Sequence, residues 1–186
     1  MAPKTFIALL RGINVSGRNM IPMPDLRSLC AELGWEEVQS YIQSGNLVFK
    51  AKSKPAQLET ELEQAIERRF GFTISIIVRA AAVWPDYIRD NPFPDASQSA
   101  PNHVMLALSK AKPKPDGIEK LQARAVVGER IVQVGDALWL LYAEGVAKSK
   151  LSPGLLDRLV GSPVTTRNWR TVLKLHEMAG PFSSQE

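Results

Sequence analysis

The sequence has few residues of the kinds that hold metals or form disulfides. Of its 186 residues, one is cysteine, Cys30, and two are histidine, His103 and His176. A single thiol cannot form an internal disulfide, and so few soft ligands do not make a metal centre. Neither histidine has a nucleophile at a recognisable spacing, so a catalytic triad is not indicated. We expect no bound metal, and we expect Cys30 to be a small core residue of the first helix.

Long apolar runs are also missing. No stretch approaches the roughly 18 to 20 residues that a membrane-spanning helix needs. Residues 1–4 lead into a short strand rather than a signal sequence, so we expect a cytoplasmic protein with no membrane partner. Hydrophobic residues make up 45% of the chain and charged residues 23%, with a formal net charge of +4, which is typical of a globular protein. The sequence leaves the cofactor and the oligomeric state open.

Residues 1–79 follow the order strand, helix, strand, strand, helix, strand. Leu26, Leu29 and Cys30 fall on one face of a helix that starts near Pro24 and stops at Gly34. A second amphipathic helix is predicted over 55–70, and strands are predicted over 4–11, 38–43, 47–49 and 73–78. This order is the split βαβ pattern of a ferredoxin-like sandwich.

Residues 80–186 are predicted to form a second, related subdomain. Strands are expected over 103–108, 130–134 and 137–142, short helices near 80–89 and 116–125, and a loop over 91–102. Ser152 predicts the start of a helix that ends at Gly161, and Thr165 with Thr166 predicts the start of another that runs to about Ala179. The predicted fold class is therefore α+β with two subdomains, a ferredoxin-like βαββαβ unit followed by a βαββαα unit.

A polar glycine loop follows the first strand. Glycine supplies backbone freedom and arginine supplies fixed positive charge, a combination that suits an anionic ligand. The loop resembles a phosphate-binding P-loop, but it lacks the lysine and the hydroxyl residue of that motif. Pro22 and Pro24 also separate the start of the next helix from the loop, so we do not expect a nucleoside triphosphatase. The alternative is a connection whose glycines serve turn geometry. The candidate ligand-binding residues here are Arg11, Asn14, Arg18 and Asn19.

A second polar cluster lies at the tip of the first hairpin, with Gln43, Ser44 and Asn46 as candidate binding residues. In a split βαβ unit the first two strands are parallel, so their ends lie at the same edge of the sheet. We therefore expect Arg11 and Gln43 to share an edge. The alternative is that residues 44–46 are only a tight turn.

A third cluster lies at the start of the last predicted helix. Arginines in a first helical turn oppose the helix dipole by a few tenths of a kcal/mol. We expect an anion or a buried carboxylate, such as Asp136 or Glu144, to offset this cost. The candidate binding residues here are Thr166, Arg167 and Asn168, with Lys148 and Lys150 nearby in the sequence.

Four segments resemble a bacterial family classed as domain of unknown function 1697. They are LLRGINVSGRN, YIQSGNLVF, the run from Lys148 to Leu151 and TTRNWRTVLKL, and the resemblance extends over residues 4–180. It implies a two-subdomain protein of α and β structure without a settled activity, cofactor or substrate. It also points to the same polar clusters, here carried by Arg11, Asn14, Gln43, Ser44, Asn46, Lys150, Arg167, Asn168 and Trp169.

The clusters predict a binding module for a phosphate-bearing or other anionic ligand, provided that they meet in one cleft. One alternative is an enzyme that acts on a phosphorylated metabolite, by analogy with acylphosphatases, in which an arginine after the first strand works with an asparagine across the sheet; Arg11 with Asn14 or Asn46 would fill these roles. Another is nucleic-acid binding, which we do not favour because residues 46–49 offer only Phe49 for base stacking.

Overall fold

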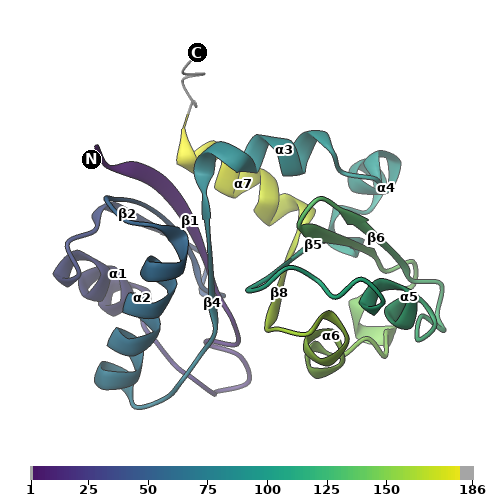
Figure 1. Cartoon of the computed structure of the whole chain (residues 1–186), viewed down its shortest axis with the longest axis horizontal. Helices are drawn as coiled ribbons and strands as arrows, with labels where there is room; N and C mark the ends of the chain where they lie inside the picture. The colour runs from purple at the N-terminus through teal and green to yellow at the C-terminus, as the bar shows by residue number, and fades with distance from the viewer. Residues whose placement is uncertain (1, 181–186) are drawn as a thin grey trace. The chain divides into compact units, whose positions relative to one another are not determined.

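Two four-stranded antiparallel sheets organise the chain (Figure 1). The computed structural model describes residues 2–180. These residues divide into two units, one of residues 2–85 with 175–180 and one of residues 86–174. The predicted α+β class is confirmed. No helix within residues 2–180 is long and apolar enough to cross a membrane.

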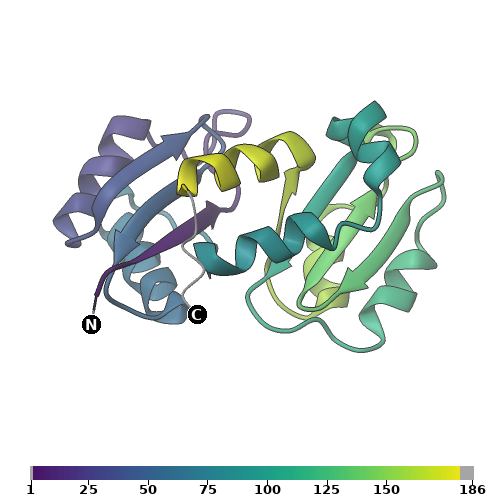
Figure 2. The same ribbon diagram turned by 90° about the horizontal axis from the view of Figure 1, so that it is seen from above.

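The first unit has the predicted ferredoxin-like order, and its strands are arranged as β2-β3-β1-β4. Its helices lie on one face of this sheet (Figures 1 and 2). The pairings of β1 with β3 and of β2 with β3 are antiparallel, so β1 and β2 run parallel. The elements are β1 (Lys4–Leu10), α1 (Met23–Glu32), β2 (Glu36–Tyr41), β3 (Asn46–Ala51), α2 (Pro55–Phe70) and β4 (Ile76–Ala80).

The core of the first unit lies between the sheet and its helices. Leu26 and Cys30 of α1 and Leu62 of α2 are fully buried there, as the helical spacing predicts. Phe49 is only 1% exposed, and its ring stacks on Trp35 at 4.0 Å between centroids. Because Phe49 is a core residue, it is not available to stack on a nucleic-acid base.

The second unit repeats the topology of the first more closely than the sequence predicts. Its strand order β6-β7-β5-β8 matches β2-β3-β1-β4 position for position. Before these strands lie η1 (Ala81–Val83), α3 (Trp84–Arg89), α4 (Pro94–Ser99) and η2 (Pro101–His103). The repeat itself comprises β5 (Val104–Ser109), α5 (Gly117–Gln122), β6 (Arg130–Val134), β7 (Ala137–Leu141), η3 (Val146–Lys148), α6 (Pro153–Val160) and β8 (Val164–Asn168), and α7 (Trp169–Ala179) follows.

The predicted helix start at Thr165 and Thr166 is wrong. Both residues lie in strand β8, which pairs with β5. The sixth element of the second unit is therefore a strand, where the prediction placed a helix. The β-branched run from Val164 favours a strand. The residue that caps α7 is Asn168, whose Oδ1 accepts the backbone N–H of Thr171 at 3.0 Å.

The predicted loop over 91–102 is also partly helical. Helix α4 starts with Pro94 in its first turn. Asn91 precedes it and forms two side-chain hydrogen bonds, accepting from the Phe93 N–H at 2.9 Å and donating to Ser97 Oγ at 2.7 Å. A polar, proline-rich composition was consistent with a loop, but the same residue types also start short helices.

In each sheet, a helix carboxylate accepts a backbone N–H of one edge strand, β4 in the first unit and β8 in the second. Glu63 accepts the N–H of Ile76 at 2.8 Å, and Asp157 accepts the N–H of Val164 at 2.9 Å. These strands lie at sheet edges, where backbone N–H groups would otherwise be open to pairing with another chain. The contacts explain why carboxylates occur on the inward side of α2 and α6.

Candidate functional site

The loop that follows β1 has an unusual backbone. Its positive φ angles need residues that tolerate the left-handed region, and glycine and asparagine are the common choices. The backbone N–H of Asn14 donates to the Asn19 carbonyl at 3.1 Å, and Asn19 Nδ2 donates to the Gly12 carbonyl at 3.0 Å. The residues with positive φ are Gly12 (66°), Asn14 (53°), Ser16 (51°), Gly17 (74°) and Asn19 (48°).

Asn14 connects this loop to the β2–β3 hairpin. Its Nδ2 donates to the Ile21 carbonyl at 2.9 Å and to the Gln43 carbonyl at 2.8 Å, and its Oδ1 accepts the Ile21 N–H at 2.8 Å. The Leu10 N–H donates to the Gly45 carbonyl at 2.8 Å. The ends of β1 and β2 therefore lie at one edge of the first sheet, as the topology predicts. We call residues 11–19 with 41–46 the loop edge.

The hairpin tip is held by Asn46, which is fully buried. Its Nδ2 donates to the Tyr41 carbonyl at 3.0 Å and to Ser44 Oγ at 3.1 Å. The amides of Asn14, Asn19 and Asn46 thus hold the loop edge together. The acylphosphatase analogy needs an amide directed at a substrate, and the amides of Asn14 and Asn46 donate to backbone carbonyls instead.

The loop edge carries one exposed arginine side chain, Arg18, whose guanidinium has no ion pair or hydrogen-bond partner within residues 2–180. The sequence contains no Asp or Glu in residues 1–24 or 38–58. Arg11 is half-buried and Gln43 is exposed. The loop edge therefore presents cationic and amide groups without a carboxylate from its own segments.

The third cluster lies in the second unit, and its meeting with the other two stays a prediction. Arg167 belongs to strand β8, not to a helical turn, so the expected conflict with the helix dipole does not arise there. Its Nη1 donates to Thr165 Oγ1 at 2.8 Å and to the Thr166 carbonyl at 2.9 Å. Burial lowers the pKa of Arg167 to about 10, so the guanidinium stays charged at neutral pH.

Arg79 is the counterpart of Arg167 in the first unit, and sequence reasoning missed it. Arg79 pairs with Ile7 of β1 in the same register position in which Arg167 pairs with Leu106 of β5. Each arginine also donates from Nη1 to the carbonyl of the preceding residue, in the case of Arg79 at 3.0 Å. Only the repeated topology shows this equivalence, because β8 was not recognised in the sequence.

The segment around Lys148 and Lys150 is organised by the serine between them. Ser149 Oγ donates to the Glu129 carboxylate at 2.5 Å and accepts the Leu151 N–H at 3.1 Å. Lys148 forms an exposed ion pair with Glu144 at 3.2 Å, while Lys150 is exposed. Ser149 was not a candidate residue, yet it fixes the segment.

Glu129 is a buried carboxylate, 3% exposed, in this network. Burial raises its pKa, but hydrogen bonds from Ser149 and the Val127 N–H outweigh that effect, and the net pKa lies below the ordinary 4.5. The Glu129 carboxylate is therefore ionised at neutral pH. Burial, together with this nearby charge, raises the pKa of Tyr142 to about 12.

Glu129→Gln is expected to lower the free energy of unfolding by about 1 to 2 kcal/mol at pH 7. A depressed folded-state pKa stabilises the fold above the unfolded value near 4.5 and ceases to do so as the pH falls through the folded value. The difference between wild type and variant should therefore shrink below pH 4.5 in urea titrations at several pH values. A difference that stays constant from pH 7 to pH 3 would show that the charge of Glu129 does not matter.

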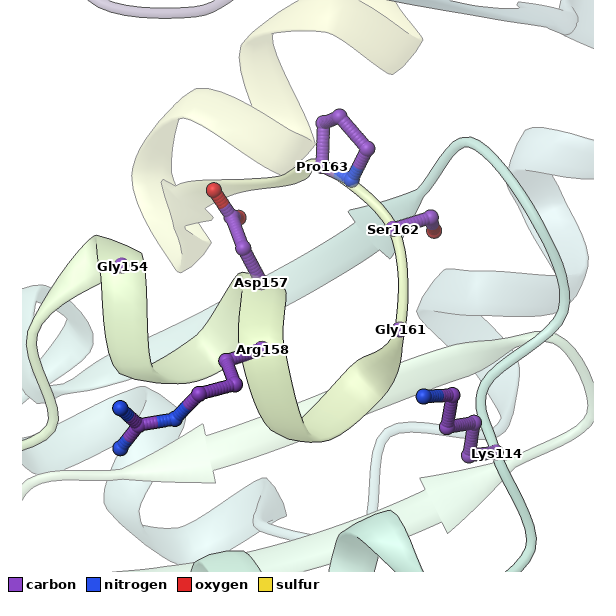
Figure 3. A pocket seen from close by; sticks show the side chains of 7 residues that line it. All are labelled: Lys114, Gly154, Asp157, Arg158, Gly161, Ser162 and Pro163. Atoms are coloured by element: carbon purple, nitrogen blue, oxygen red, sulfur yellow. The ribbon is translucent and has the colours of Figure 1, made fainter.

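A hollow of about 400 Å³ lies beside α6 in the second unit. Figure 3 shows Arg158 and Lys114 on different sides of the helix turn and the carboxylate of Asp157 directed away from both. The charged groups that line this hollow therefore do not converge on one point. It is lined by Lys114, Gly154, Asp157, Arg158, Gly161, Ser162 and Pro163.

A hollow of about 500 Å³ lies beside the start of α2 in the first unit. Lys52 and Lys54 line it and are exposed, but Glu61 also lines it and places a carboxylate there. Trp35 and Leu58 also line it and are buried core residues. This hollow is the competing location for an anion in the same unit.

The thiol and the acidic residues do not suggest chemistry elsewhere. Cys30 is fully buried as predicted, and burial raises the pKa of its thiol to about 12, so it is not a nucleophile. Within residues 2–180, no three His, Cys, Asp or Glu side chains are grouped so that they could hold a metal ion.

Comparison with known proteins agrees with this fold. Two ferredoxin-like units in tandem define an α+β protein whose fold alone does not specify an activity. The model of a protein family of unknown function, DUF1697, matches residues 4–139, and the chain belongs to this family. The match includes the loop edge, whereas the segments around Lys150 and Arg167 lie beyond it.

A solved structure shows the same overall fold. It is that of the conserved bacterial protein SP0830 from Streptococcus pneumoniae, with a TM-score of 0.73 and 23% sequence identity. The alignment covers 96% of this chain and 99% of that protein. No protein with a curated description matches the chain.

Proposed function

We propose that this protein binds a phosphate-bearing or other anionic ligand at the loop edge of its first unit. The observation that carries the proposal is the 2.8 Å hydrogen bond from Asn14 Nδ2 to the Gln43 carbonyl, because it joins two polar loops into one surface. Arg18 supplies an exposed guanidinium at this surface without an internal partner in the described chain. An arginine fork is well suited to phosphate or carboxylate oxygens.

Backbone groups of the loop add to this proposed receptor. The N–H groups of Ser16 and Gly17 donate no hydrogen bond within residues 2–180, and both residues have positive φ. Successive free N–H groups in a turn can bind an anion. The Asn14, Asn19 and Asn46 amides act as positioning groups in this proposal, since they hold the loops that carry Arg18 and the free N–H groups.

The proposal concerns binding and assigns no reaction. Asn168 caps a helix and Lys148 pairs with Glu144, so both side chains already have structural partners. Lys150, Thr166 and Arg167 stay predictions for an additional contact. An enzyme that acts on a phosphorylated metabolite has less support, because the asparagine amides on which the analogy depends hold the loops.

Arg18→Ala is expected to reduce the affinity for inorganic phosphate and pyrophosphate by about tenfold or more, since a charge-assisted hydrogen bond is lost. Isothermal titration calorimetry at low and physiological salt measures this loss, and wild-type binding should weaken with salt. Arg68→Ala is the matched control, because Arg68 is also an exposed arginine of the first unit without a partner in the described residues. Equal losses in the two variants, or no binding by the wild type, would contradict the proposal.

A further inference from the structure

Large apolar side chains are exposed at the loop edge and immediately beside it. Val15 is 55% exposed, Met20 is 56% exposed and Ile42 is 52% exposed. The other exposed large hydrophobics of the described chain lie far from these three in the sequence, namely Val83, Val126, Val146 and Leu173. Single exposed hydrophobics are ordinary, but a group of them on one surface marks an interaction site.

The contacts of Asn14 bring the backbone segments that carry these three exposed residues close together. Val15 follows Asn14 in the chain, and Met20 precedes Ile21, whose N–H and carbonyl both bond to the Asn14 side chain. Ile42 precedes Gln43, whose carbonyl also bonds to Asn14. Each exposed side chain thus belongs to a residue adjacent to one in this hydrogen-bonded cluster.

Ile42 is held outward at a conformational cost. Its φ is 48°, which is rare for a β-branched residue. The carbonyls on both sides of it are fixed, that of Tyr41 by Asn46 Nδ2 at 3.0 Å and that of Gln43 by Asn14 Nδ2 at 2.8 Å. The surrounding hydrogen bonds therefore maintain an exposed apolar side chain in a strained position.

Charge selects among the ligands that could cover this apolar surface. Arg18 lies in the same loop as Val15, and the segments that form the loop edge carry no Asp or Glu. A neutral apolar ligand would leave the guanidinium unused, and inorganic phosphate would leave the apolar side chains exposed. The complementary ligand has an anion next to an apolar group.

We propose that the ligand of the loop edge is an organic phosphate monoester, with its phosphate on Arg18 and its apolar ring or chain on Val15, Met20 and Ile42. This inference depends on the proposed function, because it names the ligand class for the same site. The apolar part can come from a nucleobase, an aromatic ring or an alkyl chain, which share the ability to bury aliphatic side chains. An acidic peptide with apolar side chains is the competing occupant.

Calorimetric titration with four phosphates tests the inference: inorganic phosphate, phenyl phosphate, hexyl phosphate and AMP. We expect at least one ester to bind about tenfold more tightly than inorganic phosphate, as burial of a small apolar area predicts. The three esters distinguish ring, chain and nucleobase. Esters that bind no better than inorganic phosphate would overturn the inference while the proposed function stands.

Ile42→Asn and Met20→Gln should remove most of the preference for the ester and leave the affinity for inorganic phosphate unchanged. Asparagine tolerates the positive φ of residue 42, so Ile42→Asn is expected to fold normally, which a thermal melt checks. Val126→Ser is the matched control, since Val126 is an exposed valine of the second unit. A preference that survives both loop variants overturns the inference. Binding of an acidic peptide without any phosphate binding overturns the inference, whereas the proposed function, which includes other anionic ligands, stands.

Discussion

Asn14→Asp is expected to destabilise the protein by about 2 to 4 kcal/mol, because it turns two hydrogen bonds into contacts between acceptors. The new carboxylate oxygen would face the Ile21 and Gln43 carbonyls, which now accept from Nδ2 at 2.9 and 2.8 Å. The contact from the Ile21 N–H to Oδ1 is retained. Aspartate has the shape of asparagine and tolerates the φ of 53°, so neither a cavity nor backbone strain confuses the result. Urea denaturation at pH 7 measures the loss.

Asn19→Asp is the matched control for this experiment. Asn19 also has a positive φ, but its side chain makes one hydrogen bond, from Nδ2 to the Gly12 carbonyl at 3.0 Å. Its loss is expected to cost about 1 kcal/mol. If Asn14→Asp were no more destabilising than Asn19→Asp, Asn14 would not be the residue that joins the two loops.

Gly45→Ala is expected to destabilise the protein by about 3 to 5 kcal/mol, since strain in the left-handed region is combined with overpacking. Gly45 has a φ of 85°, and a Cβ there would lie 2.7 Å from the Leu10 Cβ and 3.0 Å from the Ile13 Cδ1. The Leu10 Cβ is bonded directly to the backbone of β1, so it cannot move aside without moving that strand, and the Ile13 side chain is buried in the core. Thermal and urea denaturation measure the effect.

Gly17→Ala separates the two causes of that loss. Gly17 has a φ of 74°, but a Cβ there would meet no atom within 4 Å. Only the conformational part should remain, about 1 to 2 kcal/mol. Equal losses for the two glycines would mean that the hairpin tip is not packed against the end of β1, and the loop edge would lose its structural basis.

The regular elements of this chain could be predicted because their signals are local. The helical spacing of Leu26, Leu29 and Cys30 predicted α1, and Ser152 predicted α6, where Ser152 Oγ accepts the Leu155 N–H at 3.3 Å. Strand β8 was missed because Thr165 and Thr166 are good residues both for a helix cap and for an edge strand. The choice depends on pairing with β5, which is a tertiary contact.

The roles of the polar residues could be predicted less well than their location. Asn14, Asn19 and Asn46 marked the loop edge in the sequence, but their amides bond to backbone carbonyls that only folding brings near. The exposure of Ile42 had no local signal, since an isoleucine beside a strand is usually buried. The function of Ser149 depends on Glu129, twenty residues earlier in the chain.

The central claim is that the loop edge of the first unit is an anion-binding surface, and backbone amide NMR tests it most directly. On titration of the full chain with phosphate and then with phenyl phosphate, we predict saturable shifts of the amides of residues 11–19 together with those of residues 41–46. The Arg18→Ala variant should lose these shifts, and the Arg68→Ala variant should keep them. Shifts confined to the hollow beside α2 or to residues around α6, or no saturable shift at all, would contradict the claim.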